Sequence, residues 1–274
     1  MLSRRAIDDI GFFQMTVSVT FVGFLFFLAL ATLRIPHVEL SFKPLLFFFL
    51  AGLFIPGLAR LLFFKSVDDV GAVITSSVYA TEPFFTTAMA IAFLGENLNL
   101  PKAIGIVAIV IGMLLMESTM HEGSHLSRRA RSWMLLIPLI GTISASIGWI
   151  LLKKGLFLCN EPIIGIAITY LGSLLIYLIA PRLLSRGLRT GIRTSIKDLR
   201  HLWKVCFFLY IGWLFKYYAL AYGSVIVVIP LASTTPLFTL LFTYLWLREL
   251  EKPSLKLVLG AMLVVLGVAL LVVL

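Results

Sequence analysis

Long apolar runs alternate with short polar links along the whole chain. Each run is continuously apolar, unlike the alternating apolar and polar residues of an outer-membrane barrel strand. A helix of about 20 apolar residues crosses the roughly 30 Å of bilayer hydrocarbon. The pattern predicts nine membrane-spanning helices, at residues 12–33, 44–64, 71–94, 102–116, 133–152, 162–180, 203–221, 224–246 and 255–274.

The composition also indicates a chain surrounded by the hydrocarbon of a membrane. Hydrophobic residues make up 60% of the 274 positions and charged residues 13%. A soluble domain of this length has too little interior to bury so much apolar side chain. We therefore expect an all-α, multi-pass integral protein of the plasma (inner) membrane, in contact with the lipid bilayer. The cations lie between the apolar runs, so the net charge of +10 does not predict nucleic-acid binding.

The loop cations predict an orientation in the membrane. One side is expected to hold fifteen of them: Arg4, Arg5, Lys65, Arg128, Arg129, Arg131, Arg182, Arg186, Arg189, Arg193, Lys197, Arg200, Lys204, Arg248 and Lys252. The other side is expected to hold Arg34, Lys43, Lys102, Lys153 and Lys154. By the positive-inside rule the first side is cytoplasmic, with the N-terminus inside and the C-terminus outside.

An internal repeat relates the third and fourth spans to the last two. A mid-helix proline precedes a helix-ending glutamate by thirteen residues in both, Pro83 to Glu96 and Pro236 to Glu249. A shift of 153 residues aligns the third span with the eighth, and shifts of 153 to 155 align the fourth with the ninth. The glutamates are expected to orient turns or cap backbone groups, and a gate role is the alternative. The last span of each repeat carries two glycines seven residues apart: Gly105 and Gly112, then Gly260 and Gly267.

The repeat divides the chain into residues 1–117 and 133–274, joined by a polar linker at 118–132. The first repeat has four predicted helices and the second has five, so the first is expected to lack its opening helix. Repeats with an odd number of spans insert with opposite topology, which is how many secondary transporters are built.

Few polar side chains interrupt the spans, and these are the candidates for substrate binding. Glu82 lies near the middle of the third span, where an ionised carboxylate is costly unless it is paired or hydrated. Thr75, Tyr79 and Thr86 share its helical face. We interpret this stripe as the lining of a cavity and Glu82 as the candidate for proton coupling. A protonated glutamate bonded to a neighbouring helix is the alternative.

The seventh span places Lys216 among Trp213, Tyr217 and Tyr218. Lys216 is a candidate to hold an anionic group of a substrate or to pair with Glu82, and snorkelling to the interface is the competing interpretation. The aromatic neighbours fit a stacking wall for a substrate ring, although at this depth aromatic residues more often pack.

Pro83 and Pro236 are expected to kink their helices and to free the carbonyls of Tyr79 and Ala232. Paired kinks indicate helices bent around a shared cavity, because freed polar groups must face protein or water. The second half of that cavity would be lined by hydroxyls, which also join helices to one another. These hydroxyls belong to Ser233, Thr234 and Thr235.

Catalytic, nucleotide-binding and metal-ligand patterns are absent from the sequence. The two cysteines, Cys159 and Cys206, have no metal-ligand spacing and are expected to be free thiols. We therefore expect neither an enzyme nor a protein with a metal or other cofactor.

Three segments resemble motifs of the EamA-like family of the drug/metabolite transporter superfamily: TEPFFTTAMAIAFLGENL, TTPLFTLLFTYLWLREL and GWILLKKGL. The first two are each followed by the paired glycines, and the resemblance covers nearly the whole chain. It implies ten helices in two inverted five-helix repeats and the export or import of small metabolites. It also implies that both termini are cytoplasmic, which conflicts with the orientation that the loop cations predict.

We therefore expect a secondary-active transporter, a permease or exporter, of small metabolites such as amino acids or drug-like compounds. It would work by alternating access around a mid-membrane cavity, as a monomer or homodimer. A lipid-carrier flippase and a non-transporting membrane partner subunit or scaffold are the alternatives. An apolar cavity open to lipid would favour the flippase.

Overall fold

The structure is a computed structural model, and it describes residues 12–34, 41–120, 132–183, 196–235, 237–238 and 255–273. Every regular element in these ranges is a helix, which confirms the all-α expectation. The elements are α2 (Phe12–Thr32), α3 (Phe42–Gly52), the π-helix η2 (Leu53–Ala59), α4 (Arg60–Val70), α5 (Ala72–Tyr79), α6 (Glu82–Leu94), α7 (Leu100–Met120), the 3₁₀ turn η3 (Ser132–Leu135), α8 (Leu136–Leu158), α9 (Pro162–Leu183), α10 (Ile196–Tyr222), α11 (Val225–Ala232) and α13 (Leu255–Val273).

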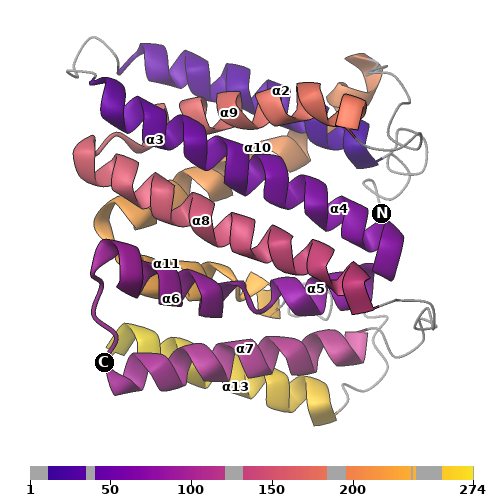
Figure 1. Cartoon of the computed structure of the whole chain (residues 1–274), viewed down its shortest axis with the longest axis vertical. Helices are drawn as coiled ribbons and strands as arrows, with labels where there is room; N and C mark the ends of the chain where they lie inside the picture. Colours follow the sequence, from indigo (N-terminus) through magenta and orange to yellow (C-terminus); the bar gives the residue numbers. More distant parts are fainter. Residues whose placement is uncertain are drawn as a thin grey trace. The chain divides into compact units, whose positions relative to one another are not determined.

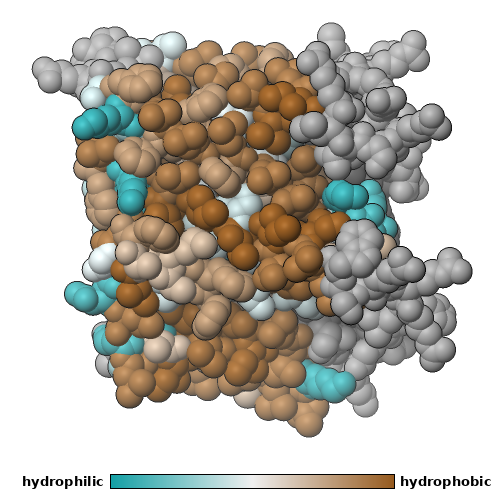
Figure 2. Space-filling view, viewed as in Figure 1, coloured by the Kyte–Doolittle hydropathy of each residue, from teal (hydrophilic) through white to brown (hydrophobic). Residues whose placement is uncertain are grey.

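The described helices have the surface of a membrane protein. Four of them are long and apolar enough to cross a bilayer: Phe42–Val70, Leu136–Leu158, Pro162–Ile179 and Leu255–Val272. Hydrophobic residues cover most of the face seen in Figure 2, and the hydrophilic ones lie mainly toward its edges. Large apolar side chains face outward as well, such as Phe208 and Phe215 of α10, which are 73% and 69% exposed. Hydrocarbon is the solvent that suits such side chains.

The second and fifth spans run beyond the ends that the sequence predicts. The second span runs over α3, η2 and α4 to Val70, beyond its predicted end at residue 64, with Pro56 in the π-helical segment. A π-segment at a proline relieves the ring's clash with the preceding turn. The fifth span ends at Leu158, not at residue 152. Lys153 and Lys154 were expected in a loop, and this was wrong because both lie within α8.

The chain forms two compact units. Unit 1 comprises Met1–Phe64 and Ile147–Tyr222, and unit 2 comprises Lys65–Ser146 and Gly223–Leu274. Their boundaries fall inside α4 and α8 and between α10 and α11. Each unit takes helices from both sequence repeats. The boundaries of the two packed units therefore differ from the boundaries of the two sequence repeats.

Unit 1 is built on α9, which packs against α2, α3, η2 and α10 (Figure 1). The helices approach closely where Gly52 meets Thr169, because a Cβ on Gly52 would lie 2.1 Å from the Thr169 carbonyl oxygen. Small residues permit such contacts between membrane helices. The Tyr177 hydroxyl of α9 donates to the Pro56 carbonyl in η2, so a backbone group at the π-segment has a partner.

Unit 2 is built on α7 and α13, which lie side by side (Figure 1). A Cβ on Gly105 would lie 2.8 Å from the Gly267 carbonyl oxygen, and one on Gly112 would lie 2.6 Å from that of Gly260. The helices are therefore antiparallel. Gly105 and Gly112 are the repeat equivalents of Gly260 and Gly267, so the contact is reciprocal, as it is across a two-fold axis.

Candidate functional site

The candidate substrate-binding residues divide between the two units. Unit 1 holds Trp213, Lys216 and Tyr217, all on α10. Unit 2 holds the residues of the third and eighth spans: Thr75, Tyr79, Glu82, Pro83, Thr86, Ser233, Thr234 and Thr235. Pro236 lies outside the described residues.

The third span is two helices rather than one kinked helix. α5 ends at Tyr79, two turn residues follow, and α6 begins at Glu82. Pro83 therefore stands in the first turn of α6, where its missing N–H costs nothing because first-turn N–H groups have no partner within the helix. The expectation of a continuous helix with a kink at Pro83 was wrong. The break lies ahead of the proline, at Ala80–Thr81, and leaves Pro83 in the first turn of α6, where its fixed φ suits the helix.

The break changes the surroundings of Glu82. This residue is not in the middle of an unbroken apolar helix but at the start of α6, where it is half-buried. The positive end of a helix dipole stabilises a carboxylate in that position. Glu82 and Tyr79 therefore belong to different helices, on the two sides of the break.

The same break occurs in the eighth span, at equivalent residues. α11 ends at Ala232, and Ser233 and Thr234 form the turn. The Thr81 hydroxyl donates to the Val78 carbonyl at 2.6 Å, and the Thr234 hydroxyl donates to the Leu231 carbonyl at 2.8 Å. These two bonds are related by the shift of 153 residues. Unit 2 thus contains two copies of one broken-helix motif.

The freed carbonyl of Ala232 accepts a hydrogen bond from the Thr235 hydroxyl at 3.0 Å. The Ser233 hydroxyl donates to the Ile229 carbonyl at 2.9 Å. Hydroxyls that bond back to the preceding turn commonly satisfy backbone groups where a membrane helix is interrupted. The three candidate hydroxyls of the eighth span are therefore bonded to their own segment.

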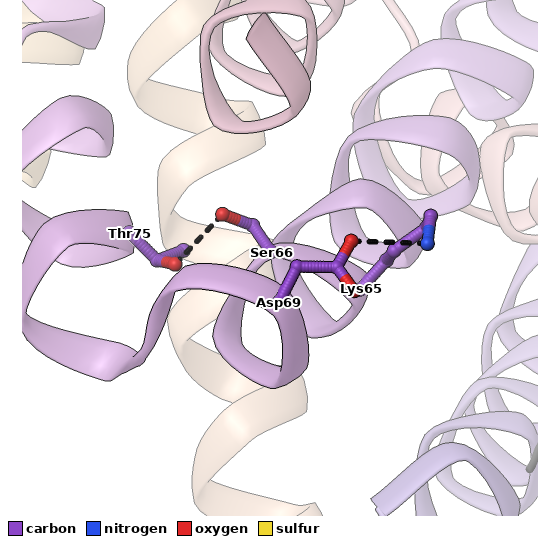
Figure 3. Close-up of polar contacts among 4 residues, drawn as sticks. All are labelled: Lys65, Ser66, Asp69 and Thr75. Atoms are coloured by element: carbon purple, nitrogen blue, oxygen red, sulfur yellow. Dashed lines mark hydrogen bonds and ion pairs between the residues drawn. The ribbon is translucent and has the colours of Figure 1, made fainter. Parts of the chain in front are cut away.

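The hydroxyls of the third span join neighbouring helices. Figure 3 shows Thr75 pointing toward Ser66 of α4, with their hydroxyl oxygens 2.8 Å apart. The same figure shows the ion pair of Lys65 and Asp69 on α4, at 3.0 Å. The Thr86 hydroxyl donates to the Ser146 hydroxyl of α8 at 2.9 Å. Both threonines are almost completely buried.

Lys216 in unit 1 lies on an aromatic surface. Its ammonium nitrogen is 3.8 Å from the centre of the Trp149 ring and 5.7 Å from that of Trp213. The two indole rings stack at 5.9 Å with an angle of 21° between their planes. The faces of aromatic rings attract a cation, and most strongly where water is excluded. The lysine charge is therefore held in place within the helix bundle.

Two tyrosines complete this cluster, which we call the lysine–tryptophan site: Trp149, Tyr170, Trp213, Lys216 and Tyr217. The Tyr170 and Tyr217 rings meet Trp213 edge-on, at 6.5 and 6.1 Å. Tyr217 is fully buried. Sequence reasoning had named Trp213, Lys216 and Tyr217 but missed the other two. Trp149 lies in the segment GWILLKKGL, and the resemblance of that segment to a family motif is the signal that could have identified Trp149.

Each unit also has an apolar groove. The unit 2 groove has a volume of about 790 Å³ and lies between α5, α6, α7 and Leu139 of α8. The unit 1 groove has a volume of about 690 Å³ and lies between α2, α3 and α9. Among the residues of the unit 2 groove, only Ser77 and Thr81 carry a hydroxyl. Such walls suit hydrocarbon chains.

The model of the EamA-like transporter family matches residues 1–118 and 131–273. The chain belongs to the EamA-like transporter family. This EamA chain is also 25% identical, over 134 residues, to an uncharacterized transporter of Clostridium kluyveri. The alignment spans 48% of the EamA chain and 43% of that relative, less than half of either protein.

A solved crystal structure overlaps 97% of the EamA chain and 90% of its own chain, with a TM-score of 0.71 and 15% identity. At that identity the likeness shows a shared fold alone. The family match confirms the resemblance seen in the sequence motifs. The chain is thus an integral membrane protein that belongs to a family of transporters.

Proposed function

We propose that this protein is a secondary-active transporter of small metabolites, such as amino acids or drug-like compounds, that works by alternating access as a multi-pass protein of the plasma membrane. The observation that carries this proposal is the duplicated helix break, at Ala80–Thr81 and at Ser233–Thr234. Discontinuous helices at equivalent positions of two repeats are the usual surroundings of the substrate site in secondary transporters. The reciprocal glycine contacts of α7 and α13 support inverted repeats.

The lysine–tryptophan site is our proposed contact for the substrate. An ammonium held against indole rings favours a metabolite that carries an acidic group and a flat apolar part. The buried Tyr217 hydroxyl adds a hydrogen-bonding group at the same place. Glu82, at the start of α6, is the proposed group for proton coupling. Residues Thr75, Tyr79, Thr86, Ser233, Thr234 and Thr235 remain proposed lining residues of the unit 2 segments.

Uptake by proteoliposomes tests this proposal. The purified protein is given a panel of radiolabelled amino acids, aromatic acids and neutral aromatic compounds, with and without a proton gradient. We expect Lys216→Ala to lower the uptake of an acidic substrate by at least about tenfold. This factor corresponds to the free energy of a hydrogen bond to a charged group. Lys154→Ala, the same change made in α8 rather than in α10, is the matched control. Uptake of no compound by the wild type would contradict the proposal.

Proton coupling is tested by comparing uptake with and without the proton gradient. The proton gradient is expected to accelerate uptake by the wild type and to have no effect on Glu82→Gln. Glu161→Gln, which changes a glutamate between α8 and α9, should respond like the wild type. Equal stimulation of the wild type and Glu82→Gln would remove Glu82 from the coupling role.

A lipid-carrier flippase is the second candidate, and the two apolar grooves favour it. The same proteoliposomes can be made with a fluorescent phospholipid, whose arrival in the outer leaflet is measured with an external quencher. Translocation of the lipid without uptake of any panel compound would support the flippase.

A further inference from the structure

Glu96 makes an unusual contact just after the end of α6. Gly95 takes a left-handed conformation, with φ of +66°, and ends the helix. This turn directs the Glu96 carboxylate to the first turn of α11. One carboxylate oxygen accepts the Val225 N–H at 2.8 Å, and the other accepts the Ile226 N–H at 3.0 Å.

These two bonds satisfy groups that α11 cannot satisfy itself. The first N–H groups of a helix have no partner within it, and a side chain at the N-cap usually provides one. The N-cap residue of α11 is Ser224, whose side chain makes no capping hydrogen bond. A carboxylate from another helix takes its place, and both its charge and its two acceptors suit the positive end of the helix dipole.

α11 is a short segment whose position depends on such contacts. It has eight residues, with Gly223 and Ser224 before it and the Ser233–Thr234 turn after it. Within unit 2 it packs against α6, the helix that precedes Glu96 (Figure 1). A segment with an interruption at both ends can move as a rigid piece, since the interruptions absorb the change in backbone angles.

We propose that Glu96 is a latch of the transport cycle: its carboxylate holds the start of α11 against the end of α6, and both bonds break each time these helix ends separate. This inference rests on the proposed function, because the separation is a step of alternating access. Glu96 is half-exposed, so water can replace the two N–H groups when the bonds open. Glu96 is thus a positioning residue, which acts through α11 and not on the substrate.

Hydrogen exchange of the full-length protein in detergent tests the latch without a substrate. Glutamine at position 96 keeps one acceptor oxygen but loses the charge and the second acceptor. We expect Glu96→Gln to speed exchange by about tenfold, the difference between a charged and a neutral hydrogen bond. The increase should appear both in the first turn of α11 and in the last turn of α6. If Glu96→Gln does not fold, Glu96→Asp is measured, because its shorter side chain keeps the charge but cannot reach both N–H groups.

One result distinguishes a latch from a simple helix cap, and a control variant accompanies it. A cap lost from α11 would expose only the Val225 and Ile226 amides, and faster exchange confined to them would overturn the proposal. Glu161→Gln, the matched change of a half-buried glutamate just before α9, should leave α6 and α11 unchanged.

Transport kinetics provide the second test, with a compound that the wild type takes up in the panel. Loss of the latch favours the state that is open at this helix end. The KM for influx and the KM for efflux should therefore change in opposite directions. Their ratio should change by about tenfold, the same factor that is expected for hydrogen exchange. A structural defect would lower the maximal rate and leave both KM values unchanged, and that result would also overturn the proposal. If the wild type transports no panel compound, the proposed function fails, and the exchange experiment still decides the latch.

Discussion

Polar side chains in unit 1 reach from one helix to the backbone of another, whereas in unit 2 many of them bond within their own segment. In unit 1, the Tyr210 hydroxyl donates to the Val19 carbonyl at 2.6 Å, and the Lys153 ammonium donates to the Leu220 carbonyl at 2.6 Å. In unit 2, Thr81 and Thr234 bond to the carbonyls three residues before them.

The difference has a mechanical consequence. Side chains that link separate helices stabilise their packing, so long continuous helices such as α9 and α10 are held at several points. Hydroxyls that bond back to their own turn stabilise a helix break but do not join it to a neighbouring helix. In unit 2 that link is made by Thr75, Thr86 and Glu96 instead. We infer that unit 1 provides the fixed lysine–tryptophan site, while unit 2 provides the segments that move.

The largest expected effect is at the glycine contact of unit 2. Gly112→Leu should destabilise the protein by about 3 kcal/mol, because its side chain would overlap the backbone of α13. Gly212→Leu, the same change in α10 of unit 1, should have an effect within about 0.5 kcal/mol, since a Cβ there has no neighbour within 4 Å. Thermal unfolding in detergent measures both. Equal losses would show that α7 and α13 are not packed through their glycines.

The second-largest expected effect is the loss of a hydrogen bond that links two helices in unit 1. Lys153→Met should cost about 2 kcal/mol, because the Leu220 carbonyl in the last turn of α10 loses a charged donor. Lys153 is 4% exposed, and its neighbour Lys154 is less buried. Lys154→Met is therefore the control and should change the unfolding temperature little. A smaller loss for Lys153→Met than for Lys154→Met would contradict the role of inter-helix links.

Two adjacent threonines of α6 give a finer test in unit 2. Thr86→Val removes the donor to Ser146 and should cost about 1 kcal/mol. Thr87→Val should be neutral or stabilising, because within the described residues the buried Thr87 hydroxyl has no hydrogen-bond partner. The pair is compared by chemical denaturation. The reverse order would remove Thr86–Ser146 from the contacts that hold unit 2 together.

The smallest effect is at the edge of unit 1, where Cys159 lies between α8 and α9. Burial and then the negative charge of Glu161 raise the pKa of the Cys159 thiol. Only the thiolate reacts with an alkylating reagent, so at pH 8 the reaction should be slower than that of a free cysteine. Glu161→Gln removes the negative charge, so the pKa of the Cys159 thiol should fall and the alkylation rate should rise. An unchanged rate would show that the Glu161 charge does not contribute to this pKa.

Several features of the site could be predicted from the sequence because they are local or repetitive. The apolar runs gave the helices, and the Pro83–Glu96 and Pro236–Glu249 spacings gave the repeat. The position of the helix break could not be predicted, because it depends on hydroxyls bonding to their own turn as well as on the proline. For the same reason Glu82 was placed in the middle of a helix and not at its start.

The sequence by itself determined that this chain is a helical membrane protein of a transporter family, because hydrocarbon leaves few ways to satisfy a backbone and the repeated motifs are read directly. The tertiary structure alone decided that Trp149 lies beneath Lys216 and that Glu96 holds the first turn of α11. Trp149 and Lys216 are 67 residues apart, and Glu96 and Val225 are 129 apart. Contacts of that range depend on how whole helices pack, which no local pattern of residues encodes.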